Sequence, residues 1–429
     1  MMTGLVSPII IQFVGFVIVA AVVTQVFLMV IHSVRRLEHE KARHDISLDL
    51  LRARVQTTMA QAGVEKNRSE LSWNGFRKFE IQKKIPEAPG VHSFYLVPHD
   101  GRKLPPFQPG QYLTFQLRLP NEQKPIVRCY SLSDTPIDPD YYRVSIKKVP
   151  PPRDKPELAP GRSSTFFNDV LKEGDILDVK APSGHFYMDM NKSTPVVLIG
   201  GGIGITPVMS MINSIVESGV KREVYFFLGL RNKAEHMMKE HLERLERENE
   251  NIHLHICYSK PDDDDVEGTD YQHAERVSVD LFKRVLPSSN FDYYMCGPPP
   301  LMSSVTTDLK EWGVPDSSVH FEAFGPASVK PKKKAEAKPA DANAPEINVE
   351  FAMSGKTLKW DGSAESILDF AEDNGINMES GCRAGNCGTC ITAVKSGDVS
   401  YSIEPGSAPE EGSCLTCICV PKENLVLDA

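Results

Sequence analysis

Four cysteines near the end of the chain constrain its fold more than any other feature. Cys382, Cys387 and Cys390 form a Cys-x4-Cys-x2-Cys run, and a further cysteine follows within the segment 414–419. This spacing is that of the thiolate ligands of a plant-type [2Fe–2S] cluster. Glycines between the cysteines let the backbone turn tightly around such a cluster. The sequence therefore predicts a chain that transfers electrons one at a time.

Zinc and disulfides are the two alternative uses of these cysteines. Structural zinc sites favour Cys-x2-Cys pairs over a Cys-x4-Cys arm, and disulfides need an oxidising compartment, which the topology argued below disfavours. Cys414, Cys417 and Cys419 compete for the role of fourth ligand. The string Leu-Thr-Cys417-x-x-x-Pro resembles the last ligand segment of ferredoxins and favours Cys417, so we expect the other two to be packing thiols.

The net charge of −9 over 429 residues argues against a nucleic-acid partner. Residues 346–429 alone carry 14 Asp and Glu against five Lys and Arg. Because acidic surfaces attract and orient basic partners, we expect a redox protein or membrane acceptor to dock on this segment. The alternative is that the acidic residues only keep a small domain soluble.

A membrane anchor is predicted at the N-terminal end. Ile9 to Ile31 is an uncharged apolar run of 23 residues, and a helix of that length spans roughly 34 Å, enough to cross a bilayer core. Arg35, Arg36, Lys41 and Arg43 follow the run directly. The positive-inside rule then places the rest of the chain in the cytoplasm, at the inner membrane. Residues 35–70 are rich in charge and are predicted to form a helical stalk.

Residues 71–191 contain short alternating runs broken by proline and glycine, which predicts a small antiparallel β-barrel. Within it, Arg128-Cys129-Tyr130-Ser131 offers a cation that can clamp a phosphate and a ring that can lie against a flavin. Gly161-Arg162-Ser163-Ser164-Thr165 opens a predicted helix whose first N–H groups and hydroxyls suit a pyrophosphate. Alone, the first string is usually an ordinary strand and the second usually a helix N-cap; in this order, together with the motifs that follow, they favour a flavin site.

Residues 192–327 alternate predicted strands and helices, as in a parallel α/β sheet. The strand at 195–199 leads into Gly200-Gly201-Gly202-Ile203-Gly204-Ile205-Thr206-Pro207 and a helix over 208–217. Such a loop lets the backbone approach a pyrophosphate. The spacing is not Gly-x-Gly-x-x-Gly and no acid ends the second strand, which disfavours a standard Rossmann dehydrogenase. The remaining expected elements are strand 223–230, helix 234–248, strand 252–258, helix 279–285 and strand 291–295.

Together these motifs resemble the ferredoxin–NADP⁺ reductase superfamily. The resemblance rests on Pro109-Gly110-Gln111-Tyr112, the Arg128–Ser131 string, the glycine loop with Thr206-Pro207, Cys296-Gly297-Pro298 and Phe321-Glu322-Ala323-Phe324-Gly325-Pro326. Residues 73–326 look most like the reductase part of flavohaemoglobins, and residues 347–429 look like a ferredoxin. The resemblance implies a multidomain chain with an antiparallel flavin barrel, an α/β nucleotide domain and an α+β, β-grasp-like ferredoxin domain.

The resemblance also implies cofactors and the residues that hold them. FAD is favoured over FMN, and NADH over NADPH, although Arg231 could contact a 2′-phosphate. Cys296 would lie near the reacting carbon of the nicotinamide, with Tyr130 and Phe324 near the flavin ring. The implied FAD contacts are Tyr112, Arg128, Tyr130, Ser131, Lys147, Gly161, Ser164 and Thr165, the implied nucleotide contacts are Gly201, Gly202, Gly204, Thr206, Cys296, Gly297 and Pro298, and the cluster ligands are Cys382, Cys387, Cys390 and Cys417.

Residues 328–346 lack aromatic residues and are expected to be a flexible linker that lets the ferredoxin domain visit the flavin and then an acceptor; an inert spacer is the alternative. The predicted function is a membrane-anchored NADH-dependent reductase that passes electrons from NADH through FAD and [2Fe–2S] to an oxygenase or other redox protein. One rival is the NADH-oxidising subunit of a respiratory quinone reductase, in which the cluster domain precedes the flavin domain. The other is a tethered redox sensor or interaction module that binds cofactors without turnover.

Overall fold

The computed structural model describes residues 8–120, 122, 125–137, 139–151, 156–323, 347–381, 383, 385, 388–402, 405 and 409–429. The expected linker at 328–346, Phe324, Cys382 and Cys387 therefore lie outside the described residues. The chain forms two compact units, of which the first ends at Asn67 and the second begins at Arg68.

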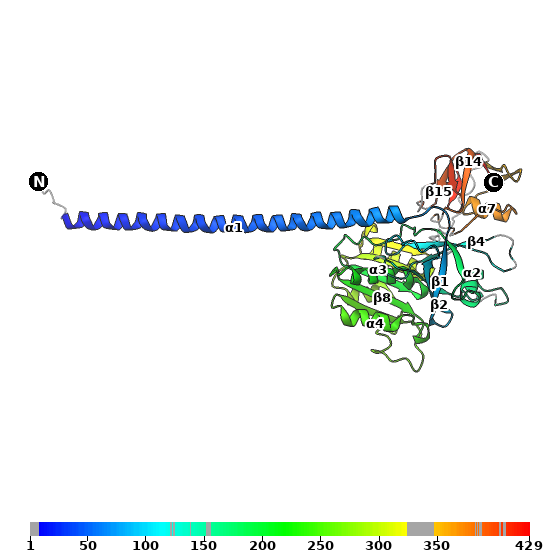
Figure 1. The fold of residues 1–429 in the computed structure, drawn as a ribbon, viewed down its shortest axis with the longest axis horizontal. Coiled ribbons are helices and arrows are strands. Elements are labelled where there is room, and N and C mark those ends of the chain that lie inside the picture. Colours follow the sequence, from blue (N-terminus) through cyan, green and yellow to red (C-terminus); the bar gives the residue numbers. More distant parts are fainter. Residues whose placement is uncertain are drawn as a thin grey trace. The chain divides into compact units, whose positions relative to one another are not determined.

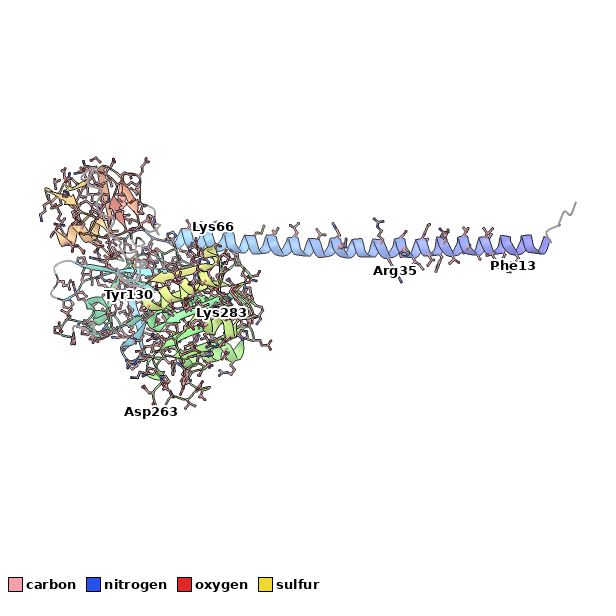
Figure 2. All side chains as sticks on the ribbon, turned by 180° about the vertical axis from the view of Figure 1, so that it is seen from behind. Phe13, Arg35, Lys66, Tyr130, Asp263 and Lys283 are labelled. Carbon is pink, nitrogen blue, oxygen red and sulfur yellow. The ribbon has the colours of Figure 1, made fainter. Side chains whose placement is uncertain are left out.

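All described residues of the first unit, 8–67, belong to one helix, which ends at Leu71 in the second unit. Helix α1 (Pro8–Leu71) runs for 64 residues without interruption (Figure 1), so the expected anchor and stalk belong to one element. Its segment Gly15–Ser33 is long and apolar enough to cross a membrane and has no residue buried within the structure. Phe13 and Arg35 lie on either side of this segment, as Figure 2 shows. The apolar side chains here are exposed, with Phe16 at 73%.

The second unit begins with an antiparallel domain. Its six-stranded sheet has the order β4-β3-β6-β1-β2-β5, and an antiparallel bridge between Leu132 and Val144 joins the segment after β4 to β5. The sheet thus curls round toward closure, which confirms the expected antiparallel flavin-type domain. Its elements are β1 (Arg77–Ala88), β2 (Val91–Pro98), β3 (Tyr112–Leu117), β4 (Ile126–Ser131), β5 (Tyr142–Lys147), α2 (Arg162–Thr165), the π-helix η1 (Phe166–Val170) and β6 (Ile176–Val179).

An aromatic cluster fills this domain because alternate strand residues point inward. Phe167 is fully buried and meets Phe94, Phe115 and Tyr130 edge-on, with ring centroids 5.1–5.4 Å apart. Edge-to-face contacts of this kind are favourable for aromatic rings. The aromatic core therefore packs against the ring of Tyr130, which lies one residue before the end of β4 at Ser131.

A parallel-sheet domain follows, with strand order β11-β10-β7-β8-β9. Helices α3 and α4 pack in the core on one face of the sheet, and α5 and α6 in the core on the other. The elements are β7 (Val196–Gly201), η2 (Gly202–Gly204), α3 (Ile205–Glu217), β8 (Val224–Leu230), η3 (Lys233–Glu235), α4 (Lys239–Glu248), β9 (Ile252–Tyr258), α5 (Val279–Val285), β10 (Asp292–Gly297), α6 (Pro299–Glu311), η4 (Asp316–Ser318) and β11 (Val319–Ala323).

One expected helix of this domain is wrong in part. The helix predicted over 234–248 is interrupted, and α4 begins only at Lys239. Met238 precedes it with φ of +57°, and Met237 and Met238 are buried in the core beneath the sheet. The left-handed turn at Met238 thus separates the segment before it from α4 and accompanies the burial of both methionines.

The C-terminal domain is small and mixed, as expected for a ferredoxin-like domain. Its five-stranded sheet has the order β13-β12-β18-β14-β16, with β15 and β17 forming a separate pair. The buried residues of α7, among them Leu368 and Ala371, belong to the same core as Cys390, Cys414, Cys417 and Cys419. Its elements are β12 (Ile347–Phe351), β13 (Lys356–Trp360), α7 (Ile367–Asp373), β14 (Ile391–Ser396), β15 (Val399–Tyr401), β16 (Ser413–Leu415), β17 (Cys419–Pro421) and β18 (Leu425–Leu427).

Candidate functional site

The end of β4 presents the first group of expected site residues. The Tyr130 hydroxyl lies 2.7 Å from Ser163 Oγ, and burial raises the pKa of this phenol to about 12. Tyr130 thus stays protonated and can donate a hydrogen bond throughout the physiological range. Arg128, two residues earlier, is exposed, and its Nη1 donates to the carbonyl of Val127. Figure 2 labels Tyr130.

The turn before α2 forms a cradle beside this strand end. A Cβ on Gly161 would lie 2.8 Å from Ser164 Oγ and 2.9 Å from the Cβ of Val149. Ser164 Oγ donates to the carbonyl of Gly161 and accepts from the N–H of Val149, so its hydroxyl shapes the turn. The hydroxyl of Thr165 is buried and has no hydrogen-bond partner among the described residues. An unsatisfied buried hydroxyl next to a tight glycine turn fits the acceptor oxygens of a bound phosphate group.

Two further expected flavin contacts occupy different surroundings. Tyr112 is 3% exposed, and its ring packs so closely on Gly184 that a Cβ there would lie 2.7 Å from it. Lys147 ends β5, and its Nζ lies 3.6 Å from Glu235 Oε1 of the parallel-sheet domain. Their assignment to FAD remains a prediction. Ser163 was not singled out from the sequence, although its position next to Ser164 in the same string was a signal for it.

The glycine loop brings β7, α3 and the end of β10 into close contact. A Cβ on Gly204 would lie 2.2 Å from the carbonyl oxygen of Cys296, and a Cβ on Gly201 would lie 2.7 Å from Pro298 Cδ. Gly202 has φ of +54°, which favours glycine. The hydroxyl of Thr206 donates back to the carbonyl of Ile203, which holds the loop at the start of α3. The expected nucleotide residues are thus gathered at the carboxyl ends of two neighbouring parallel strands, where such sheets bind ligands.

Cys296 and Glu322 lie side by side at the ends of β10 and β11. The two residues are register partners, and burial raises the pKa of the Cys296 thiol well above its usual value. Glu322 belongs to the Phe321–Pro326 string, but the motif alone indicates no role for it. Burial raises its pKa to about 8, and the Ser131 hydroxyl donates to Glu322 Oε2 at 3.4 Å. Ser131 and Glu322 therefore connect the expected flavin strand with the expected nucleotide sheet.

Two cysteines of the C-terminal domain, Cys390 and Cys417, lie close together, and Cys414 and Cys419 are buried in the same core. Cys390 Sγ and Cys417 Sγ are 3.1 Å apart, so the two side chains point to the same place in the domain. The loop between the first three cysteines contains Arg383, Gly385 and Gly388, all with positive φ, and a Cβ on Gly385 would lie 2.4 Å from the side chain of Ile418. The turn thus packs directly against the residue after Cys417. These features fit a cluster-binding loop.

The raised pKa of Glu322 predicts a pH dependence of stability. The raised pKa lets the folded protein hold a proton on this carboxyl up to about pH 8, whereas a Glu in the unfolded chain releases it at its ordinary pKa of 4.5. The stabilisation by this proton is present in full below the unfolded pKa and is lost as the pH rises through 8. We expect Glu322→Gln, which keeps the shape without the charge, to unfold at a higher denaturant concentration than the unchanged protein at pH 9. The advantage should shrink as the pH falls to 5; an equal difference at both pH values would contradict it.

Three family models match the chain in succession. An oxidoreductase FAD-binding domain matches residues 80–187, an oxidoreductase NAD-binding domain matches residues 198–307, and a 2Fe-2S iron–sulfur cluster-binding domain matches residues 351–422. Each match falls on one of the three domains of the second unit.

Curated relatives match the first two of these domains. A flavohemoprotein of Bacillus cereus is 40% identical over 264 residues, covering 62% of this chain and 64% of its own. One of Rhizobium meliloti is 37% identical over 271 residues, covering 62% and 66%. The chain thus spans less than two thirds of the length of these relatives.

Solved structures extend the comparison to the C-terminal domain. The flavohem-like FAD/NAD-binding domain of nitric oxide dioxygenase from Vibrio cholerae is 28% identical with a TM-score of 0.52, covering 59% of this chain and all of that one. Phthalate dioxygenase reductase, described as a modular structure for electron transfer from pyridine nucleotides to [2Fe–2S], is 27% identical with a TM-score of 0.51, covering 83% and 98%. This chain is an NAD(P)H-dependent oxidoreductase with FAD-binding, NAD-binding and [2Fe–2S] domains in that order, homologous to the reductase modules of flavohemoproteins and to phthalate dioxygenase reductase.

Proposed function

We propose that the chain is a membrane-anchored, NADH-dependent reductase that delivers electrons to a partner oxygenase or another redox protein. The observation that carries this proposal is the order of three cofactor domains on one chain, the last of which brings Cys390 and Cys417 together. A flavin accepts a hydride from a nicotinamide and releases single electrons, and a [2Fe–2S] cluster carries them one at a time.

The residues of the chain divide the work of holding these groups. Tyr130 and Thr165 offer hydroxyls on the antiparallel domain for FAD, with Arg128 as an exposed cation nearby. Gly201 and Gly204 keep the start of α3 close to β10, which leaves a backbone surface that a pyrophosphate can approach. Cys382, Cys387, Cys390 and Cys417 supply the four cluster thiolates. Glu322 is partly buried, and with its pKa raised to about 8 it can hold a proton beside Ser131.

NADH is favoured over NADPH by the charges at the end of β8. In nucleotide-binding sheets of this type the ribose 2′ position is read at the end of the second strand. Here Asn232 donates through Nδ2 to Asp262 Oδ2, and the N–H of Lys233 donates to Asp265 Oδ2. Four consecutive aspartates, 262–265, therefore border this segment and would repel a 2′-phosphate. Arg231, directly after β8, would instead attract a 2′-phosphate and so favour NADPH.

The nature of the electron acceptor is inferred from the charge of the C-terminal domain and from the similarity of the chain to phthalate dioxygenase reductase. Residues 346–429 carry 14 acidic against five basic residues, which suits a basic docking surface on a redox partner. Phthalate dioxygenase reductase, which this chain covers almost completely, is named for its service to a dioxygenase. The respiratory rival predicts the cluster domain ahead of the flavin domain, the reverse of the order matched here.

Membrane attachment is supported by the apolar segment Gly15–Ser33 of α1 and by Arg35 and Arg36 directly after it. A 19-residue helical segment spans about 28 Å, close to the thickness of a bilayer core. The basic residues favour the cytoplasmic side of an inner membrane for everything that follows.

Electron order and cluster ligation can be tested with one pair of variants. We expect Cys417→Ser to lose most of its iron and its cytochrome c reductase activity, while ferricyanide reduction by NADH, which a flavin alone supports, stays within about twofold. Cys414→Ser, altered at a buried cysteine of the same core, is the matched control and should keep both. Full iron content in Cys417→Ser would refute the ligand assignment, and loss of both activities would refute the electron order.

Nucleotide preference is tested by comparing kcat/KM for NADH and NADPH. We expect at least about tenfold preference for NADH, because unpaired charge repulsion is costly at a binding surface. Asp262→Asn should narrow this ratio, whereas Asp263→Asn, at the tip of the same loop (Figure 2), should change it little. A preference for NADPH in the unchanged protein would overturn the assignment.

Attachment to the membrane is tested by removing residues 1–34. We expect the complete protein to stay in the membrane pellet after an alkaline carbonate wash, and the shortened protein to appear in the supernatant with its NADH–ferricyanide activity intact. Release of the complete protein by carbonate would show that α1 does not span the bilayer.

A further inference from the structure

Asp134 lies where the antiparallel domain meets the parallel-sheet domain. It follows β4 by three residues, directly after the Tyr130-Ser131 strand end, and its side chain is 15% exposed. Within its own domain its carboxylate is held by Arg143 Nη1 at 3.3 Å, by the hydroxyl of Tyr141 at 3.0 Å and by the N–H of Thr135. These three donors fix the direction in which the carboxylate points.

The opposite side of Asp134 is bonded to helix α3. The Ser210 hydroxyl donates to the main-chain carbonyl of Asp134 at 2.7 Å, and Asn213 Nδ2 donates to Asp134 Oδ1 at 3.1 Å. Ser210 is fully buried and Asn213 is 4% exposed. Two buried polar side chains of one helix thus use their donors on a single residue of the other domain.

The network continues into α4 with a consistent donor direction. His241 Nε2 lies 2.8 Å from Asn213 Oδ1, and Arg244 Nη2 lies 2.8 Å from His241 Nδ1. Burial, with Arg143 and Arg244 nearby, lowers the pKa of His241. A neutral imidazole can accept from Arg244 at Nδ1 and donate to Asn213 at Nε2, which turns the Asn213 amide nitrogen toward Asp134.

The position of these bonds relates them to the site. Helix α3 begins at Ile205, immediately after the glycine loop, and Ser210 lies five residues, or about 7.5 Å, along it. On the other side, Asp134 is three residues from Ser131. The remaining contacts between the domains include apolar ones, since Phe186 and Met188 of the first domain enter the core of the second. Apolar contacts hold surfaces together without fixing an angle, whereas hydrogen bonds are directional.

We propose that Asp134, Ser210 and Asn213 form an interdomain latch that positions the glycine loop against the Tyr130–Ser131 strand end. The latch sets how the nicotinamide-binding and flavin-binding segments face each other, and its residues act through those segments. The proposal rests on the proposed reductase function, because it concerns the rate of NADH-dependent flavin reduction.

The test is the rate of flavin reduction after mixing with NADH, measured by stopped-flow absorbance on the complete FAD-loaded protein. We expect Ser210→Ala/Asn213→Ala to lower the rate at saturating NADH by about tenfold or more, because a shift of about 1 Å in reacting groups can cost up to a hundredfold. The dissociation constant for NADH and the FAD content should change by less than about twofold. Ser214→Ala is the matched control, because Ser214 is equally buried but its hydroxyl donates within α3, to Ser210 O.

A second variant separates positioning from simple structural support. Asn213→Asp places a carboxyl against Asp134, with Arg143, Tyr141, His241 and Arg244 as the surrounding titratable groups. We expect its rate, relative to the unchanged protein, to recover as the pH falls from 8 to 6, because one shared proton relieves the repulsion.

The latch would be overturned if the double variant reduced its flavin at saturating NADH within twofold of the rate of the unchanged protein. If the double variant does not fold, the same criterion applies to Asn213→Ala alone. A rate loss explained entirely by lost FAD, or an Asn213→Asp profile parallel to that of the unchanged protein, would also overturn the latch. Failure of the unchanged protein to reduce its flavin with NADH would instead overturn the proposed function.

Discussion

The site depends on the close approach of two backbone segments, the start of α3 and the end of β10. Gly204 lies where any side chain would collide with the carbonyl of Cys296, and Gly201 lies where it would collide with Pro298. This contact can form only between glycines and an extended strand end, because a Cβ would push the two elements apart. It brings the glycine loop, the Cys296-Gly297-Pro298 segment and Glu322 to one edge of the sheet. The geometry of this edge of the parallel-sheet domain therefore requires glycine at positions 201 and 204.

The periodic and punctuated parts of the sequence predict most of the fold. The apolar run at 9–31, the alternating strands of the barrel and the strand–glycine–helix unit each have a local sequence pattern that matches the element found in the structure. The interrupted helix before α4 does not, because Met237 and Met238 are compatible with helical propensity although the chain turns there and buries both in the core. Tertiary burial outweighs local preference there.

The site is predictable where a motif is contiguous and less so where it is assembled from separate elements. The string around Cys417 favours it among three cysteines, and its sulfur lies 3.1 Å from that of Cys390; its role as a ligand stays a prediction. Ser163, Glu322 and Asp134 were assigned no role, because their contacts lie 33, 191 and 79 residues away in the sequence. Phe324, Cys382 and Cys387 lie outside the described residues and remain predictions. Spacing reveals ligands that share a loop, but not partners that meet only after the sheets have formed.

The hydrogen bonds from Arg244 through His241 and Asn213 to Asp134 have a consequence for the exchange of modules between homologous reductases. A chimaera joined near residue 191 would inherit the barrel and its aspartate from one parent and the matching helix from the other. Its halves would fold, yet their mutual angle would be set by whichever polar residues happened to face each other. A functional chimaera is thus expected only when Asp134 and its hydrogen-bonding partners on the helices come from the same parent. Among homologues, a substitution on one side of this interface should be accompanied by a compensating substitution on the other.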